Sequence, residues 1–216
     1  MSLTSIALLI IDVQRYYTEA SAPLLQVTES MEPGGTRYIR TRIDTIVIPN
    51  IQKLLVAARH YGCPVIFARL CGLETSRRDL HQNFYAYDLE AYKGHGCHVY
   101  PLASEPLACV DPRIMPLSTE FIIDKTGYSA FHQTCLRSLL KDLNVDTVVL
   151  TGLTTSQCVN TTARAAADWE FRTLMVEDAQ ADYDRDSHEA ALLSSEAMTG
   201  RSYLTEEIIE WLAQQE

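Results

Sequence analysis

Three residues that could together catalyse acyl transfer lie at or just after separate apolar runs of the chain: Asp12, Lys125 and Cys158. A thiol can attack a carbonyl carbon, a carboxylate can carry the thiol proton, and an ammonium group can stabilise a thiolate. The apolar runs predict buried strands, and in open α/β sheets ligands collect at the carboxyl ends of the strands. We therefore expect the three side chains to converge on one pocket.

Each of these residues also has a plainer interpretation. Cys158 falls in the first turn of a predicted helix that Thr155 or Ser156 could cap, where free amides, the helix dipole and Lys125 would favour a thiolate. Most cysteines are nevertheless small buried hydrophobes. Asp12 could cap a neighbouring turn, and Lys125 could lie on the surface with its charge in water. The three residues indicate a site only because all of them are expected at the carboxyl ends of strands in one sheet.

The apolar runs alternate with helical patterns, which predicts an α/β fold of three layers, Rossmann-like, with a mostly parallel sheet flanked by helices on both faces. We expect a single domain over residues 1–216. Pro49 is expected in the first turn of one helix, and Thr205 at the N-cap of another. The predicted strands are 5–13, 64–70, 120–124, 146–151 and 172–177, and the predicted helices begin near residues 49, 136, 159, 187 and 205.

Residues 71–118 show no clear period and are predicted to be irregular. Loops of this length are uncommon within a compact domain. The segment is therefore interpreted as a lid, a substrate-binding excursion or a subunit contact.

The composition is that of a soluble globular protein, with 47% hydrophobic and 21% charged residues. A net charge of −10 argues against nucleic acid and anionic membrane surfaces as partners. The apolar run 6–11 is too short to span a bilayer, and no basic segment precedes it. None of the six cysteines forms a CxxC pair. We expect a cytoplasmic protein with reduced thiols.

The order and spacing of four motifs resemble those of the isochorismatase-like cysteine hydrolases. The opening resembles their "hhxDxQ" start, and two later blocks resemble "K-x-x-x-SAF-x-x-T-x-L" and "TGxxTxxCV…TA…A". Each block alone is weak, but the ordered set extends over nearly the whole chain. The matching segments are 9–14, 125–136, 151–166 and the dipeptide Asp178-Ala179.

The resemblance implies a catalytic triad of Asp12, Lys125 and Cys158. It also implies a cis peptide between Leu153 and Thr154, and an oxyanion hole made by the amides of Thr154 and Cys158. The implied reaction is cleavage of a C–N bond in a small amide or ureido compound, through a thioester on the cysteine. The amidohydrolase branch is favoured, similar to enzymes acting on N-carbamoylsarcosine, maleamate and biuret.

Substrate contacts are predicted for four residues. Tyr17 and Phe131 stand where family members have aromatic residues that line the pocket, and Thr155 belongs to a "TTSxC" pattern of the amidohydrolases. Arg78 could bind a substrate carboxylate bidentately, although a solvated charge cluster is equally consistent with the sequence. The same choice is open for three further arginines, Arg37, Arg40 and Arg77.

No cofactor is expected. Nicotinamidases of this superfamily carry an Asp-x-His metal site after the second strand, and residues 69–75 lack it. His95, Cys97 and His98 could bind zinc, but a fourth ligand is not evident, and a mobile glycine loop is the preferred interpretation. The resemblance also implies a homodimer or homotetramer. Two other functions stay open: a vinyl-ether hydrolase of the isochorismatase type, and a thiol sensor or scaffold on the same fold.

Overall fold

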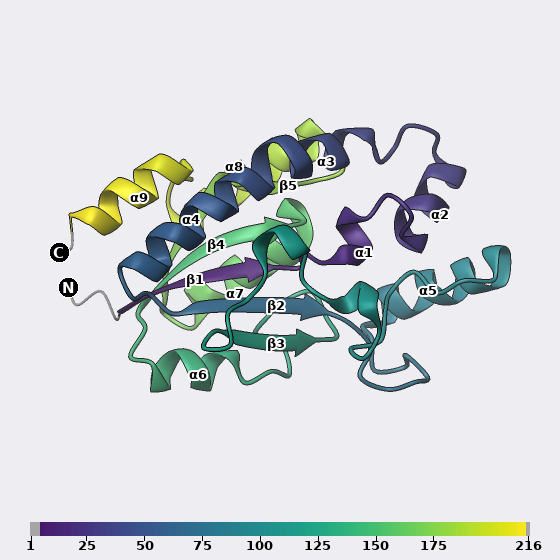
Figure 1. Cartoon of the computed structure of the whole chain (residues 1–216), viewed down its shortest axis with the longest axis horizontal. Coiled ribbons are helices and arrows are strands. Elements are labelled where there is room, and N and C mark those ends of the chain that lie inside the picture. The colour runs from purple at the N-terminus through teal and green to yellow at the C-terminus, as the bar shows by residue number, and fades with distance from the viewer. Residues whose placement is uncertain (1–4, 215–216) are drawn as a thin grey trace.

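A parallel sheet forms the centre of the computed structural model, which describes residues 5–214. Its five strands lie in the order β3-β2-β1-β4-β5, and every pairing is parallel. Their carboxyl ends therefore meet along one edge, the right-hand edge in Figure 1. The strands are β1 (Ile6–Ile11), β2 (Val65–Leu70), β3 (Phe121–Lys125), β4 (Thr147–Leu153) and β5 (Arg172–Ala181).

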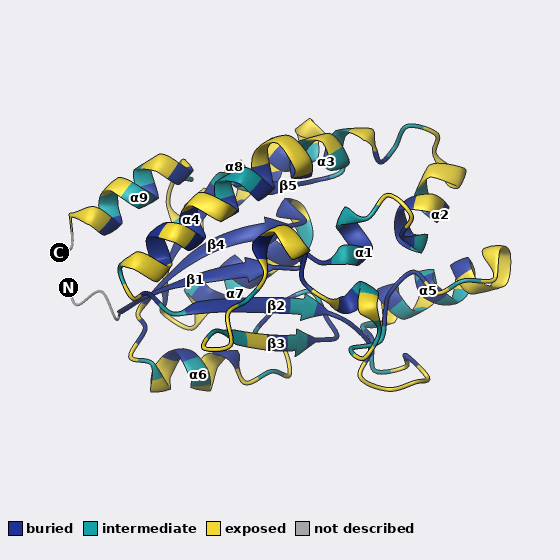
Figure 2. Cartoon of the chain, viewed as in Figure 1, coloured by how far each residue is buried: buried dark blue, intermediate teal, exposed yellow. Residues whose placement is uncertain are grey.

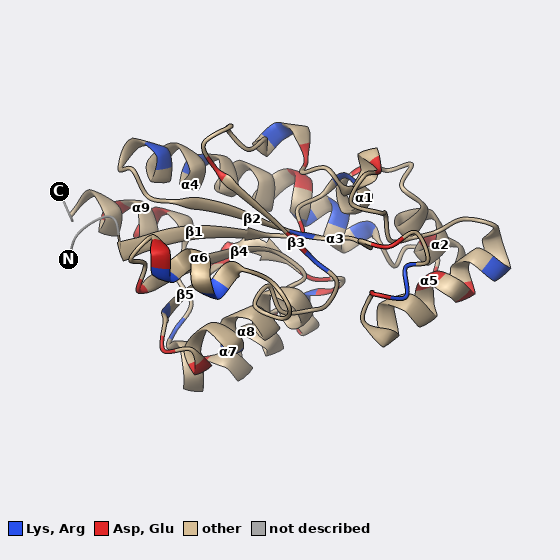
Figure 3. Ribbon diagram, turned by 90° about the horizontal axis from the view of Figure 1, so that it is seen from below, with Lys and Arg blue, Asp and Glu red and all other residues tan. Residues whose placement is uncertain are grey.

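Helices cover both faces of this sheet, as the sequence predicted. α4 and α9 lie on one face, with α6, α7 and α8 on the other (Figure 3). α1, α2 and α5 lie beyond the carboxyl ends of the strands (Figure 1). The helices are α1 (Arg15–Thr18), α2 (Pro23–Met31), α3 (Arg37–Arg42), α4 (Ile48–His60), α5 (Gln82–His95), α6 (Leu136–Asp142), α7 (Asn160–Asp168), α8 (Arg185–Thr199) and α9 (Thr205–Ala213).

The core lies between these layers, because the central strands are apolar on both sides. All six residues of β1 and all seven of β4 are buried. Figure 2 shows the central strands buried, the edge strand β3 partly exposed, and the outer faces of the helices exposed. Strands buried on both faces give continuous apolar runs rather than alternation, which is why their positions could be read from the sequence. Among residues 5–214, no helix is long and apolar enough to cross a bilayer.

The helix predicted to begin at Pro49 begins earlier. α3 passes without a break through a π-helical turn, Ile43–Val47, into α4. The amide of Ile48 donates to the carbonyl of Ile43, a five-residue spacing. Proline lacks the amide that a regular α-helix would use. The local change to π spacing is compatible with a proline inside this long helix.

Part of the segment predicted to be irregular is helical. α5 occupies 14 residues within 71–118. Its buried residues are Phe84, Asp88 and Ala91, so a carboxylate stands in the middle of the apolar stripe. Asp88 is buried because its Oδ1 accepts from the amides of Val99 and Tyr100. A charged residue at that position hid the helical period.

Two smaller boundaries also differ from the predictions. β5 extends to Ala181, so Asp178 and Ala179 lie within the strand instead of after it. Leu204, not Thr205, is the N-cap of α9. The Thr205 hydroxyl donates to Oδ1 of Asp178, which fastens the start of α9 to β5.

Candidate active site

Asp12, Lys125 and Cys158 meet at the carboxyl edge of the sheet. The Lys125 ammonium nitrogen lies 2.8 Å from Oδ2 of Asp12 and 3.3 Å from the Cys158 sulfur. It also donates to the carbonyl of Gly127 at 2.9 Å. All three side chains are almost fully buried, with exposed fractions of 4% or less. One ammonium group therefore contacts both the carboxylate and the thiol, away from bulk water.

Three different strands deliver these residues. Asp12 follows β1 directly, and Lys125 is the last residue of β3. β2 lies between those two strands, so the long lysine side chain extends past it to reach the carboxylate. The side chain of Gln14 fixes the segment after Asp12, because its amide bonds both the carbonyl and the N–H of Leu70.

The backbone of β4 approaches β1 very closely beside Asp12. Gly152 has a φ of +110°, and an added Cβ would lie 2.0 Å from the carbonyl oxygen of Ile11. Only glycine fits this conformation and this separation. The Leu153–Thr154 peptide that follows is cis, as the resemblance implied.

Burial sets the protonation states of the site. Burial raises the pKa of Asp12, and the neighbouring Lys125 ammonium opposes this shift only in part. Burial also works against a charge on Lys125, but the neighbouring Asp12 and Cys158 outweigh it and raise the lysine pKa. The Cys158 pKa is raised by burial, lowered by Lys125 and raised again by Asp12, so it ends well above its ordinary value. Burial therefore works against the thiolate that the position of Cys158 in the helical turn favours.

The turn that carries Cys158 is not capped in the way the sequence predicted. Thr154 is its N-cap and makes no side-chain capping bond, and residues Thr155–Val159 form a π-helical turn before α7. The missing cap comes from elsewhere in the chain: Oδ2 of Asp182 accepts from the amide of Ser156 at 2.6 Å. Asp182 follows β5, so a remote carboxylate occupies the position that Thr155 or Ser156 was expected to fill.

A buried polar chain reaches the same turn from α8 and α3. The Thr155 hydroxyl lies 2.7 Å from Nδ1 of His188, and Nε2 of that ring lies 3.0 Å from a guanidinium nitrogen of Arg42. Burial and the Arg42 charge lower the His188 pKa from 6.5 to about 4. Neither His188 nor Arg42 was predicted from the sequence as a site residue. One feature could have indicated a buried role for His188: it shares the core-facing side of α8 with Ala191 and Ser195.

Tyrosines surround the thiol. Tyr16, Tyr17 and Tyr100 are buried, and Tyr183 is half-buried. Burial raises the pKa of each of the four phenols, and a charge on Cys158 would add to this shift. The role of Tyr17 as a substrate contact stays a prediction. The Phe131 ring packs on Phe171, directly before β5.

The arginines proposed as substrate contacts have different surroundings. Arg78 is exposed, and the buried Arg77 is paired with the Glu105 carboxylate at 3.0 Å. Arg37 and Arg40 line a hollow on the surface beside α3. In the 95–98 loop, His98 bonds Oδ2 of Asp88 through Nδ1 and stacks on Tyr92.

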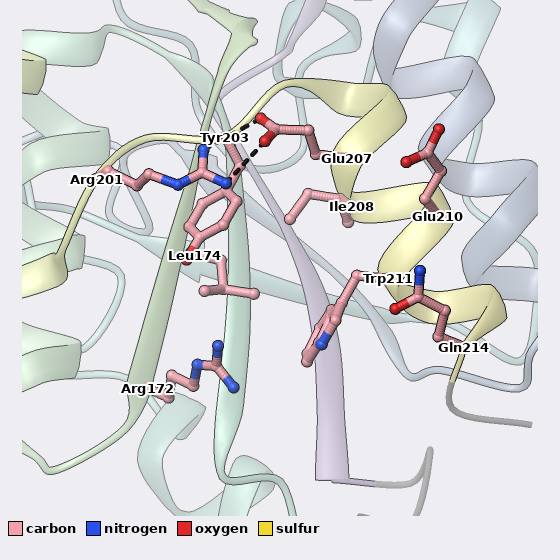
Figure 4. A pocket seen from close by; sticks show the side chains of 9 residues that line it. All are labelled: Arg172, Leu174, Arg201, Tyr203, Glu207, Ile208, Glu210, Trp211 and Gln214. Atoms are coloured by element: carbon pink, nitrogen blue, oxygen red, sulfur yellow. Dashed lines mark hydrogen bonds and ion pairs between the residues drawn. The ribbon is translucent and has the colours of Figure 1, made fainter.

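A surface pocket of about 250 Å³ lies well away from Cys158, between the amino end of β5 and α9 (Figure 4). Leu174 and Ile208 line its apolar part, and Trp211 stands beside Arg172. Arg201 is already paired with Glu207 at 2.7 Å. This pocket contains none of the residues that meet at the thiol.

The model of the isochorismatase domain matches residues 6–207. The chain belongs to the isochorismatase family. Maleamate amidohydrolase of Pseudomonas putida is 38% identical to it over 95 residues, 44% of this chain and 45% of that protein. N-carbamoylsarcosine amidase of an Arthrobacter species is 30% identical over 133 residues, 60% of this chain and 47% of that protein. The matched stretches thus span less than half the length of these two relatives.

Solved structures of isochorismatase-like proteins share the fold over its full extent. A cysteine hydrolase from Pseudomonas syringae pv. phaseolicola superposes with a TM-score of 0.80 at 23% identity, over 100% of this chain and 96% of that one. At this identity the likeness shows the α/β architecture alone.

Proposed function

We propose that this isochorismatase-family protein is a cysteine-dependent hydrolase that cleaves the C–N bond of a small amide or ureido compound through a thioester on Cys158. The observation that carries the proposal is the buried contact of one ammonium group with both a carboxylate and a thiol. Such an arrangement supplies a nucleophile, a proton carrier and a fixed positive charge within one water-poor site.

The first step is proton removal. Cys158 rests as a thiol, so it needs a base when the substrate arrives. The Asp12 carboxylate is near enough for the two groups to influence each other's pKa, and burial makes this carboxylate more basic than usual. Asp12 takes the thiol proton, and Lys125, 3.3 Å from the sulfur, stabilises the thiolate as it forms.

The second step is acylation. The Cys158 sulfur attacks the substrate carbonyl carbon, and the carbonyl oxygen becomes an oxyanion. The amides of Thr154 and Cys158, at the start of the helical turn after β4, are the proposed donors to this oxyanion. When the tetrahedral intermediate collapses, the C–N bond breaks and the leaving nitrogen takes the proton held by Asp12.

The last step is hydrolysis of the thioester. Asp12, again ionised, takes a proton from a water molecule as that water attacks the acyl carbon. The C–S bond breaks, the sulfur recovers the proton, and an acid is released. The products are one acid and one amine or ammonia for each water consumed, and no redox partner is required.

Two relatives support the choice of bond, because one is a maleamate amidohydrolase and the other an N-carbamoylsarcosine amidase. The proposed pocket includes Tyr17 and the Thr155 side of the turn. Buried phenols near the thiol would offer ring surface for packing and hydroxyl groups for polar contacts with a small substrate.

The test is ammonia release from a panel of maleamate, N-carbamoyl amino acids, biuret, nicotinamide and ureidoacrylate-like compounds, with mass spectrometry of the protein during turnover. A good substrate is expected to leave an acyl adduct on Cys158. Cys158→Ala should remove both the adduct and the turnover.

Cys63→Ala is the matched control, because Cys63 is equally buried but lies before β2, at the opposite end of the sheet. It should keep full activity. Near wild-type turnover by Cys158→Ala would overturn the proposal and leave water attack assisted by Asp12, as in a vinyl-ether hydrolase, as the better account. The thiol-sensor alternative loses support from the structure, since a protonated thiol exposed by only 4% is a poor target for oxidants.

A further inference from the structure

The turn that carries Cys158 is held by side chains from distant parts of the chain. Its first two residues, Thr155 and Ser156, bond to His188 and Asp182. His188 lies in α8 and is itself bonded to Arg42, the last residue of α3. Arg42 is tied down as well, because it donates to the backbone carbonyls of Gln180 and Glu177 at 2.8 Å each.

The direction of these hydrogen bonds follows from the chemistry of the groups. A guanidinium group only donates and stays charged at any ordinary pH. Nε2 of His188 must therefore accept from Arg42, and a neutral ring then carries its proton on Nδ1. That N–H donates to the Thr155 hydroxyl oxygen. The same reasoning excludes a protonated ring, since two cations would face each other at 3.0 Å, and it agrees with the lowered pKa of His188.

We propose that Arg42 and His188 are positioning residues that fix the turn carrying the Cys158 nucleophile by way of the Thr155 hydroxyl. They touch neither the thiol nor the carboxylate in the contacts described above, and their effect passes through Thr155. The inference rests on the proposed hydrolase function, since positioning matters only if Cys158 and the adjacent amides react.

A device of this kind is needed because the turn lacks its own cap. A π-helical turn with an N-cap that makes no side-chain bond is weakly fixed by itself. The Cys158 sulfur must nevertheless stay at 3.3 Å from Lys125 while the proposed oxyanion donors keep their direction. A displacement of about 1 Å at such a site can reduce the rate by about 10²-fold.

The first experiment tests the hydrogen bonds from Arg42 through His188 to Thr155 directly and needs no substrate. In ring-¹⁵N-labelled protein at pH 7, the His188 imidazole is expected as the neutral form with its proton on Nδ1. Arg42→Met should shift the ring toward the other tautomer, because Nε2 loses its donor. A wild-type ring that is protonated, or that carries its proton on Nε2, would overturn the inference whether or not a substrate is known.

The second experiment measures kcat and KM with the best substrate of the panel. Thr155→Val and His188→Leu should each lower kcat by on the order of 10²-fold and leave KM within about threefold. Thr155→Ser and His188→Asn should restore most of the rate, because the first keeps the hydroxyl and the second keeps an N–H near the place of Nδ1. The double variant Thr155→Val/His188→Leu should lose no more than the worse single variant.

Arg201→Met is the control for the loss of a guanidinium group. Arg201 also bonds a backbone carbonyl and a carboxylate, but it lies in the surface pocket beyond β5. Melting temperatures separate positioning from unfolding. If His188→Leu and Thr155→Val keep wild-type kcat while Cys158→Ala is inactive, this inference fails and the proposed function stands. If Cys158→Ala keeps its activity, the proposed function fails, and the tautomer measurement still decides whether the chain of hydrogen bonds exists.

Discussion

Replacing Gly152 by alanine tests the closest backbone approach in the site. The new Cβ would lie 2.0 Å from the Ile11 carbonyl oxygen and 2.7 Å from its nitrogen. An ordinary contact needs more than 3 Å, so β1 and β4 would have to separate by about 1 Å at the residue before Asp12. Both atoms belong to backbone in the middle of the sheet, so no flexible side chain can move aside.

The expected loss of stability in Gly152→Ala has two parts. A positive φ costs an alanine about 1–2 kcal/mol. Separation of the strands would also weaken at least two buried backbone hydrogen bonds, each costing about 1–3 kcal/mol when left unsatisfied. We expect Gly152→Ala to reduce the free energy of unfolding by about 4 kcal/mol or more, a large share of the roughly 5–15 kcal/mol typical of a domain.

Gly62→Ala is the matched control, because Gly62 has a φ of +69° but nothing within 4 Å of the added Cβ. It should show only the conformational cost of about 1–2 kcal/mol. Urea titrations of both variants, with the slope compared alongside the midpoint, measure the difference. If Gly152→Ala loses no more stability than Gly62→Ala, the strands separate easily and the reasoning about the close approach is wrong.

Other predictions concern the chemistry, the pH response and the assembly. Asp12→Asn should lower kcat by on the order of 10²-fold or more, since both proton transfers pass through that carboxylate, and it should not add to the loss in Cys158→Ala. As pH falls from 6.5 to 4, the unfolded state protonates at His188 before the folded state does, so the free energy of unfolding should fall by about 3 kcal/mol; acid denaturation of His188→Asn should lack this contribution. Chelators should leave turnover unchanged, because residues 69–75 lack the Asp-x-His ligands of the nicotinamidases; loss of activity restored by zinc or iron would contradict this. Light scattering is expected to give a mass above the 24.3 kDa of one chain, and a monomer at micromolar concentration would reject the proposed homodimer or homotetramer.

The sheet could be predicted from the sequence because its strands are continuous apolar runs, and Asp12 and Lys125 could be placed at their ends. Features set by remote contacts could not be predicted. Asp88 is tolerated inside the buried stripe of α5 because two amides of a later loop satisfy it. The turn that carries Cys158 is capped by Asp182, which follows β5 and is remote in the sequence. The sequence shows the helical position of Cys158, which favours a thiolate, but not the burial beside a carboxylate that raises its pKa.

The extension of Lys125 past β2 has a consequence for how the protein acquires activity. The lysine, the carboxylate and the thiol come from β3, β1 and the turn after β4, so they meet only when four adjacent strands are paired in register. Parallel strands join segments that are distant along the chain, and such contacts form slowly during folding. A chain that has collapsed but has not yet paired β3 would contain most of its secondary structure and no working site. During refolding from urea, turnover should therefore return later than helical circular dichroism and together with the completed sheet.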